Sequence, residues 1–154
     1  MSDKQRYPAS IARKVADEMA TELAPRCERI EIAGSLRRGK ADVGDIEILY
    51  VPRIGQVRVP GELFPRRGKL AVHVASGIPV DLFATTTERW FVSLVMRTGS
   101  AQSNTRLANA ALKRGMQFHA YGVIQDRSGQ QIIPQSEREV FERLGVPYRD
   151  PSER

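Results

Sequence analysis

The segment from Gly34 to Tyr50 constrains the fold of this chain more than any other. Alternate residues of a strand point to the same face, so a strand over about 44–51 would place Asp45 and Glu47 side by side. Its other face would point into a core, with Ile46, Ile48 and the aliphatic part of Tyr50. Neighbouring carboxylates repel each other, and a divalent cation such as Mg²⁺, which takes hard oxygen ligands, removes that repulsion. The pattern therefore predicts a cation site, with a solvated strand face as the alternative.

A second set of residues directly precedes these carboxylates. The apolar strand expected over 28–33 runs into Gly34-Ser35, and the arginines Arg37 and Arg38 follow. Backbone N–H groups of a glycine-serine turn and planar guanidinium groups both suit phosphate oxygens. Cation-binding and phosphate-binding parts within one short stretch favour nucleotide chemistry over the solvated face.

Charge and composition agree with a polyanionic partner. The 154 residues carry a net charge of +6, which favours nucleic acid or nucleotides. Cys27 is the only cysteine, so an intramolecular disulfide is impossible and a cysteine-based zinc site is disfavoured. No apolar run reaches membrane-spanning length, and the first residues are polar, so we expect a cytoplasmic chain that does not bind a membrane.

The first half of the chain predicts a helix and several strands. A helix is expected over 8–24, with an apolar face built from Ile11, Val15, Met19 and Leu23. Further strands are expected over 70–76 and 78–83, after a Gly-, Pro- and Arg-rich excursion over 53–69. Asp81 stands among apolar residues in the last strand. It marks either a half-exposed edge or a third cation ligand.

From Trp90 onward the apolar period changes from two to about four. We expect a helix with a threonine cap before it, a second helix over 101–114, a hairpin over 116–133 and a helix from Ser136 that Gly145 ends. The inward residues of the second helix would be Leu107, Ala111 and Leu112. The fold class is therefore α/β (α+β): a small mixed sheet in residues 1–85, and a smaller lobe of helices and a hairpin in residues 86–154.

Basic side chains gather at two places that could contact a nucleic-acid backbone. One set lies at the exit of the excursion and the other on the outward face of the 101–114 helix: Arg66, Arg67 and Lys69, and Arg106, Lys113 and Arg114. A solvated basic surface is the alternative for both sets.

With its elements in this order, the chain resembles the catalytic core of the family X DNA polymerases, the group that contains DNA polymerase beta, within the nucleotidyltransferase superfamily. The resemblance covers about Arg6 to the last residue, as a palm and a nucleotide-binding lobe only. It rests on three motifs: Gly34-Ser35-Leu36-Arg37-Arg38 followed by Gly44-Asp45-Ile46-Glu47; Thr98-Gly99-Ser100 with Asn104 and then Ala111-Leu112-Lys113-Arg114-Gly115; and Val146–Arg154.

The resemblance implies a role for each matching position. The catalytic and metal-binding carboxylates would be Asp45, Glu47 and Asp81, holding two Mg²⁺ ions that Mn²⁺ can replace. The triphosphate would contact Gly34, Ser35, Arg38 and Gly44, with Arg6 as a further phosphate contact. The sugar and base of the nucleotide would meet the segment containing Thr98, Gly99 and Asn104.

The activity implied is two-metal nucleotidyl transfer to a primer 3′-hydroxyl, as in short gap filling during DNA repair. The partners would be a DNA primer and template and nucleoside triphosphates, and we expect a monomer. Among the departures from the family, two concern residues of the site: Glu47 replaces the usual aspartate, and Met96-Arg97 replaces the aromatic pair that commonly precedes Thr-Gly. The second departure predicts relaxed sugar selection.

Two other functions remain open from the sequence. One is a nucleotidyltransferase that acts on an RNA end, a protein or a small molecule. The other is a nucleic-acid-binding module without catalytic activity, against which the presence of all three acids argues.

Overall fold

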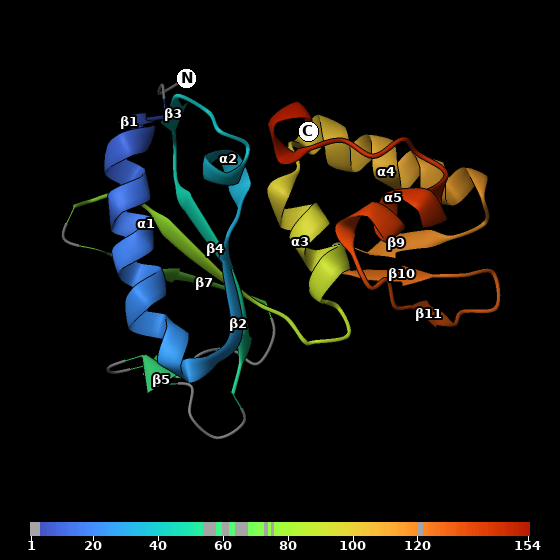
Figure 1. The fold of residues 1–154 in the computed structure, drawn as a ribbon, viewed down its shortest axis with the longest axis horizontal. Helices are drawn as coiled ribbons and strands as arrows, with labels where there is room; N and C mark the ends of the chain where they lie inside the picture. Colours follow the sequence, from blue (N-terminus) through green and yellow to red (C-terminus); the bar gives the residue numbers. More distant parts are fainter. Residues whose placement is uncertain are drawn as a thin grey trace.

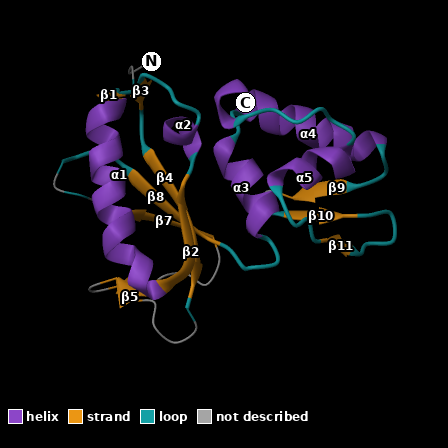
Figure 2. Ribbon diagram, in the orientation of Figure 1, coloured by secondary structure: helices purple, strands orange, loops and turns teal. Residues whose placement is uncertain are grey.

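The computed structural model describes residues 4–53, 58–59, 62–63, 68–72, 74, 76–119 and 122–154. Figure 1 shows two lobes side by side: a sheet backed by the long helix α1, and a lobe in which helices α3, α4 and α5 pack with strands β9–β11. Figure 2 shows that strands and helices occur in both lobes. The α+β architecture expected from the sequence is confirmed.

The helices are α1 (Ala9–Leu23), α2 (Gly34–Arg37), α3 (Trp90–Thr98), α4 (Ala101–Lys113) and α5 (Glu137–Leu144), with 3₁₀ turns η1 (Ala24–Arg26) and η2 (Pro151–Glu153). The strands of the first lobe are β1 (Tyr7–Pro8), β2 (Cys27–Ile32), β3 (Asp42–Val43), β4 (Ile46–Pro52), β5 (Arg58–Val59), β6 (Glu62–Leu63), β7 (Gly68–Val72) and β8 (Val80–Ala84). Those of the second lobe are β9 (Gln117–His119), β10 (Val123–Gln125) and β11 (Gln131–Ile132).

The main sheet has the strand order β2-β4-β8-β7. Strands β4 and β8 are parallel, whereas β2 and β7 pair with them antiparallel, so the sheet is mixed as expected. The register of the parallel pair sets Glu47 directly opposite Asp81.

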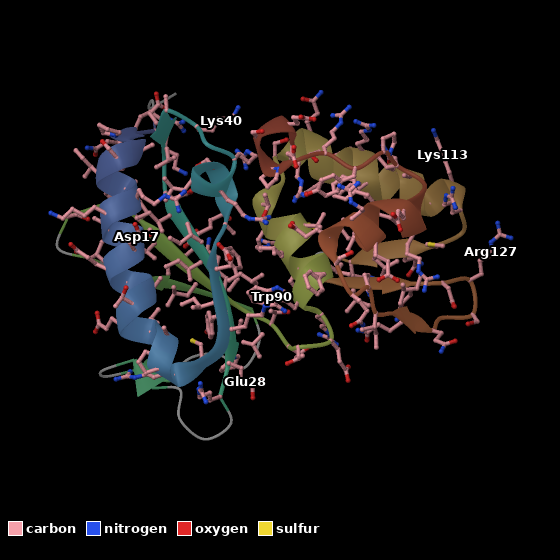
Figure 3. All side chains as sticks on the ribbon, viewed as in Figure 1. Asp17, Glu28, Lys40, Trp90, Lys113 and Arg127 are labelled. Carbon is pink, nitrogen blue, oxygen red and sulfur yellow. The ribbon has the colours of Figure 1, made fainter. Side chains whose placement is uncertain are left out.

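Both faces of β4 are covered, and by different elements. Ile46, Ile48 and Tyr50 are fully buried in the cluster that contains Ala12 and Ala16 of α1. On the other face, Leu49 and Val51 pack with Trp90 and Leu94 of α3 in a smaller apolar cluster that joins the two lobes. Figure 3 shows Trp90 at this junction. Because residues alternate along a strand, Glu47 shares the face of Leu49, which faces the second lobe.

The apolar face expected for the first helix is partly wrong. Ala12 and Ala16 are fully buried, with Val15 and Met19 packed beside them, whereas Ile11 is 52% exposed. A repeat of four residues drifts by about 40° per step on a helix of 3.6 residues per turn. Ile11, at the far end of the expected row, therefore lies outside the contact with the sheet.

Two smaller expectations about the second lobe are also corrected. Leu107 and Ala111 of α4 are buried as expected, but Leu112 is 64% exposed, because one residue along a helix is a rotation of about 100° away from Ala111. The N-cap of α3 is Arg89 rather than a threonine, and no side chain caps it in the N-cap position.

The other helix ends follow the sequence. The hydroxyl groups of Ser100 and Ser136 cap α4 and α5 by accepting hydrogen bonds from Ser103 N at 3.1 Å and Glu139 N at 3.0 Å. Gly145 ends α5 with a φ of 68°. Among the described residues, no helix combines the length and the apolar character needed to cross a membrane.

Candidate active site

The structure brings the three predicted carboxylates together at one end of the sheet. Asp45 directly precedes β4, Glu47 lies within β4, and Asp81 lies opposite Glu47 on β8. Strand alternation and register place all three on one face of the sheet, next to Leu49 and Phe83. Asp81 therefore lies on an inner strand beside the acidic pair, and not at an isolated edge of the sheet.

The electrostatics of Glu47 show how close the acids are. Burial raises the pKa of the Glu47 carboxyl above its usual value, and the negative charges of Asp45 and then Asp81 raise it further. The cations that oppose this rise are Arg97 and, more weakly, Arg38. The three acids therefore repel one another, so binding a divalent cation would relieve the repulsion.

Each outer carboxylate is paired with a lysine. Lys4 Nζ lies 2.8 Å from Asp45 Oδ2, and Lys69 Nζ lies 3.3 Å from Asp81 Oδ2. The pKa of Lys4 is raised, chiefly by its hydrogen bond to Asp45 and the charge of that carboxylate. The sequence predicts that Lys69 contacts DNA, and the structure places its ammonium at Asp81.

The donor set suits Mg²⁺, although it is not preassembled. Three carboxylates offer only hard oxygen ligands, which is the chemistry that Mg²⁺ takes. Within the described ranges, no group of three or more histidine, cysteine, aspartate or glutamate side chains is already arranged around one metal position. Asp45 and Asp81 are each paired with a lysine, so a metal ion would have to compete with an ammonium group for one oxygen of each carboxylate.

The predicted phosphate-binding turn is the short helix α2, not an open turn. Gly34 begins it with a φ of 61°, a conformation that favours glycine. A Cβ at this position would collide with the Glu47 carboxylate oxygen Oε2. The backbone of α2 therefore lies directly against an acid of the site, which explains why glycine stands there.

The other predicted phosphate ligands differ in their burial and in their hydrogen-bond partners. Ser35 is half-buried on α2. Arg38 donates from Nη1 to the Thr98 carbonyl oxygen at 3.0 Å, and its buried Nε has no hydrogen-bond partner. Arg6 is bound to Asp42, with Nε 2.7 Å from Oδ1. The side chain of Lys4 lies over Gly44.

The nucleotide segment of the second lobe contains another unsatisfied polar atom. Asn104 donates from Nδ2 to the Met96 carbonyl oxygen at 2.8 Å, while its buried Oδ1 has no hydrogen-bond partner and lies close to Gly99. Buried polar atoms without partners are rare, and each calls for an explanation. The side chains of Arg38 and Asn104 both contact the Thr98-Gly99 segment, so their unsatisfied atoms fit a bound polar ligand at this junction.

An ion network that the sequence did not reveal joins the lobes here. Arg37 donates from Nη1 and Nη2 to the two carboxylate oxygens of Glu137 at 2.7 and 2.8 Å, and from Nη1 to Thr98 Oγ1 at 2.7 Å. Arg154 donates to Glu137 Oε1 at 2.8 Å. Thr98, expected to meet the nucleotide, is thus held by arginines of the first lobe through both its hydroxyl and its carbonyl group.

The basic residues expected to contact DNA are only partly described. Arg66 and Arg67 lie outside the described residues. The three basic residues of the 101–114 segment are exposed and line an open groove of about 560 Å³ between α4 and the end of α5: Arg106, Lys113 and Arg114. Figure 3 shows Lys113 at the outer end of the second lobe.

The amino-acid sequence is similar to those of DNA polymerases. Residues 93–154 match the family described as DNA polymerase beta thumb. The chain is 26% identical over 96% of its length to the DNA polymerase/3′-5′ exonuclease PolX of Bacillus subtilis. It is 27% identical over 79% of its length to DNA polymerase lambda of Rattus norvegicus. The chain spans 28% of the length of each of these relatives.

Proposed function

Because this chain is family X DNA polymerase-like, we propose that it transfers nucleotides from nucleoside triphosphates to the 3′-hydroxyl of a DNA primer. The observation that carries the proposal is the placement of Glu47 opposite Asp81, with Asp45 beside them, under the backbone of α2. Short gap filling in DNA repair is the setting that such an activity suits.

In this proposal the carboxylates of Asp45, Glu47 and Asp81 are the metal-binding and catalytic groups. Two Mg²⁺ ions bound there, or Mn²⁺ in their place, would lower the pKa of the primer hydroxyl and neutralise the triphosphate. The Ser35 hydroxyl and the Arg38 guanidinium hold the β- and γ-phosphates, assisted by Gly34, Gly44 and Arg6. Fixing the triphosphate at these groups aims the α-phosphate at the hydroxyl, so orientation contributes as well as charge.

The second lobe orients the nucleotide in this scheme. Gly99 leaves space for the sugar, and Asn104 has an amide oxygen without a partner for the sugar or base. Residues 1–85 would form the palm and residues 86–154 the nucleotide-binding subdomain. The Arg37–Glu137 pair and Thr98 join the two where the nucleotide binds.

We propose relaxed sugar selection as the consequence of Met96-Arg97. The Arg97 guanidinium lies 4.4 Å from the centroid of the Phe83 ring, and its charge acts on Glu47. A flexible cationic side chain therefore stands where the family has an aromatic ring. Such a side chain excludes a ribose 2′-hydroxyl less rigidly than a ring does.

DNA would be held by the basic groove of the second lobe. Contacts of Arg106, Lys113 and Arg114 with phosphates are electrostatic and independent of sequence. Lys69 would join them only after leaving Asp81. A monomer that holds DNA through these phosphate contacts would bind it in a salt-sensitive way and add few nucleotides per encounter.

Primer extension tests this function. Gapped, templated and single-stranded DNA would be incubated with dNTPs or rNTPs and Mg²⁺ or Mn²⁺, using the wild type, Asp45→Asn and the exposed control Asp17→Asn. We expect the wild type and Asp17→Asn to add templated nucleotides and Asp45→Asn to add none. Absence of addition to all three DNA substrates, with triphosphate still bound in a metal-dependent way, would favour transfer to an RNA end, a protein or a small molecule. Triphosphate binding absent altogether would favour a module without catalytic activity.

A further inference from the structure

Lys4 is a cation of the site that the sequence motifs do not include. Its ammonium lies 2.8 Å from Asp45 Oδ2, and its stem lies along the backbone of Gly44. A Cβ at Gly44 would stand 3.0 Å from Lys4 Cε and 3.2 Å from Nζ. The absence of a side chain at Gly44 thus gives Lys4 its path into the site.

The ion pair that Lys4 makes is cheap to break. The Lys4 side chain is 64% exposed, and an ion pair between exposed groups contributes about 0–1 kcal/mol. A divalent cation on Asp45 would neutralise the partner of Lys4 and repel its ammonium. The displaced ammonium would then stand beside the densest negative charge that a nucleoside triphosphate brings.

The nearby arginines are less free to move. Arg6 makes two hydrogen bonds to Asp42, at 2.7 and 2.9 Å, and Arg38 is bound to the Thr98 carbonyl oxygen. A lysine is a compact charge on a flexible stem, so it can follow a phosphate oxygen where a fixed guanidinium fork cannot.

We propose that Lys4 is a triphosphate-binding residue, which exchanges the Asp45 carboxylate for a non-bridging phosphate oxygen when a cation–nucleoside triphosphate complex enters the site. This inference rests on the proposed function, because it needs a cation–triphosphate complex to bind at Asp45 and Glu47. Without nucleotide, Lys4 acts in the opposite sense and competes with the metal ion for Asp45.

These two actions give opposite signs in binding experiments. Titration calorimetry would measure the binding of dATP with Ca²⁺, which supports binding without turnover. The electron paramagnetic resonance spectrum of free Mn²⁺ would measure the binding of Mn²⁺ without nucleotide. The variants are Lys4→Gln, Lys4→Arg and Lys14→Gln, which removes the same charge from the exposed face of α1. Lys4→Gln should weaken dATP binding about tenfold, which corresponds to the loss of one charged hydrogen bond. Binding of dAMP should stay unchanged. Mn²⁺ without nucleotide should bind more tightly, because Lys4 no longer competes for Asp45.

Lys14→Gln should behave as wild type, and Lys4→Arg should keep most of the dATP affinity. Equal dATP binding by Lys4→Gln and wild type would overturn the role of Lys4 and leave the proposed function intact. Tighter dATP binding by Lys4→Gln would do the same, because it would make Lys4 a competitor only. Failure of the wild type to bind dATP with Ca²⁺ would overturn both.

Discussion

Replacing Glu137 with glutamine removes the one negative charge that two guanidinium groups share between the lobes. Both oxygens of this carboxylate accept from Arg37, and Oε1 also accepts from Arg154, all at 2.7–2.8 Å. The Arg154 side chain is 0% exposed and that of Glu137 is 14% exposed. Glutamine keeps the shape and one acceptor oxygen but removes the carboxylate that both guanidinium groups contact, which leaves Arg37 with only the more distant charge of Glu31.

The expected loss is large because the Arg154 side chain is fully buried and those of Arg37 and Glu137 are mostly so. Removing one partner of a buried ion pair destabilises a protein by about 3–5 kcal/mol, since the remaining charge stays out of water. Glutamine still accepts one hydrogen bond, so we expect the low end of that range, about 3 kcal/mol. Because Arg37 belongs to the first lobe and Glu137 to the second, the packing between the lobes should weaken as well.

Trp90 provides the assay. It is the only tryptophan of the chain and lies buried where α3 meets the sheet. Urea unfolding followed by its fluorescence would compare Glu137→Gln with Glu142→Gln, a charge removal on the exposed side of the same helix. The control should change the free energy of unfolding by no more than about 0.5 kcal/mol. A loss below about 1 kcal/mol in Glu137→Gln would refute the reasoning.

The same variant has a defined pH dependence. Burial alone would raise the pKa of Glu137, but the hydrogen bonds and charges of Arg37 and Arg154 outweigh it and hold the pKa below its usual 4.5. A carboxyl with a depressed pKa contributes stability that is complete above its unfolded value and is lost as pH falls through its folded value. The difference between wild type and Glu137→Gln should therefore be constant above about pH 5 and shrink in more acidic solution. A difference that grows on acidification would contradict the network.

Two further predictions concern the site and the basic groove. Gly34→Ala should lose more stability in urea unfolding than Gly39→Ala. Both glycines have a positive φ, 61° and 73°, in which an alanine costs about 1–2 kcal/mol. Only at Gly34 would the added Cβ also collide with Glu47. Equal losses would argue against the close approach of α2 to the acid. Neutralising the groove cations Arg106, Lys113 and Arg114 should make DNA binding less dependent on salt. The slope of log binding constant against log salt concentration, measured by fluorescence anisotropy, should fall by about 0.7–0.9 for each phosphate that is no longer neutralised. An unchanged slope would place DNA elsewhere.

Sequence patterns predicted the parts of the fold that are set locally. Alternation around Asp45 and Glu47 predicted the buried strand β4 and the shared face of its acids. The helix start at Ser136 and the helix end at Gly145 were predicted, because a cap acts within a few residues. The residue roles assigned from the family resemblance stay predictions.

Interactions between distant segments were beyond such patterns. Arg37 and Glu137 are 100 residues apart, and nothing in the local pattern of either indicates the other. The contact of Lys69 with Asp81 comes from the pairing of β7 with β8, and the basic run around Lys69 does not indicate it. The apolar row of α1 failed at Ile11 because the sheet packs against only part of the helix. Each miss comes from packing rather than from local preference.

The most direct test of the account is single-turnover insertion of one templated nucleotide by Asp81→Asn beside Asp17→Asn. Asp81 has no part in the acidic pair that defines the motif, so its importance follows from the register of β4 and β8. The account predicts a loss of at least about 10²-fold in the insertion rate of Asp81→Asn, with the fold and dATP binding retained, and none in Asp17→Asn. Insertion at the wild-type rate by Asp81→Asn would contradict the claim that the three carboxylates form one reaction centre.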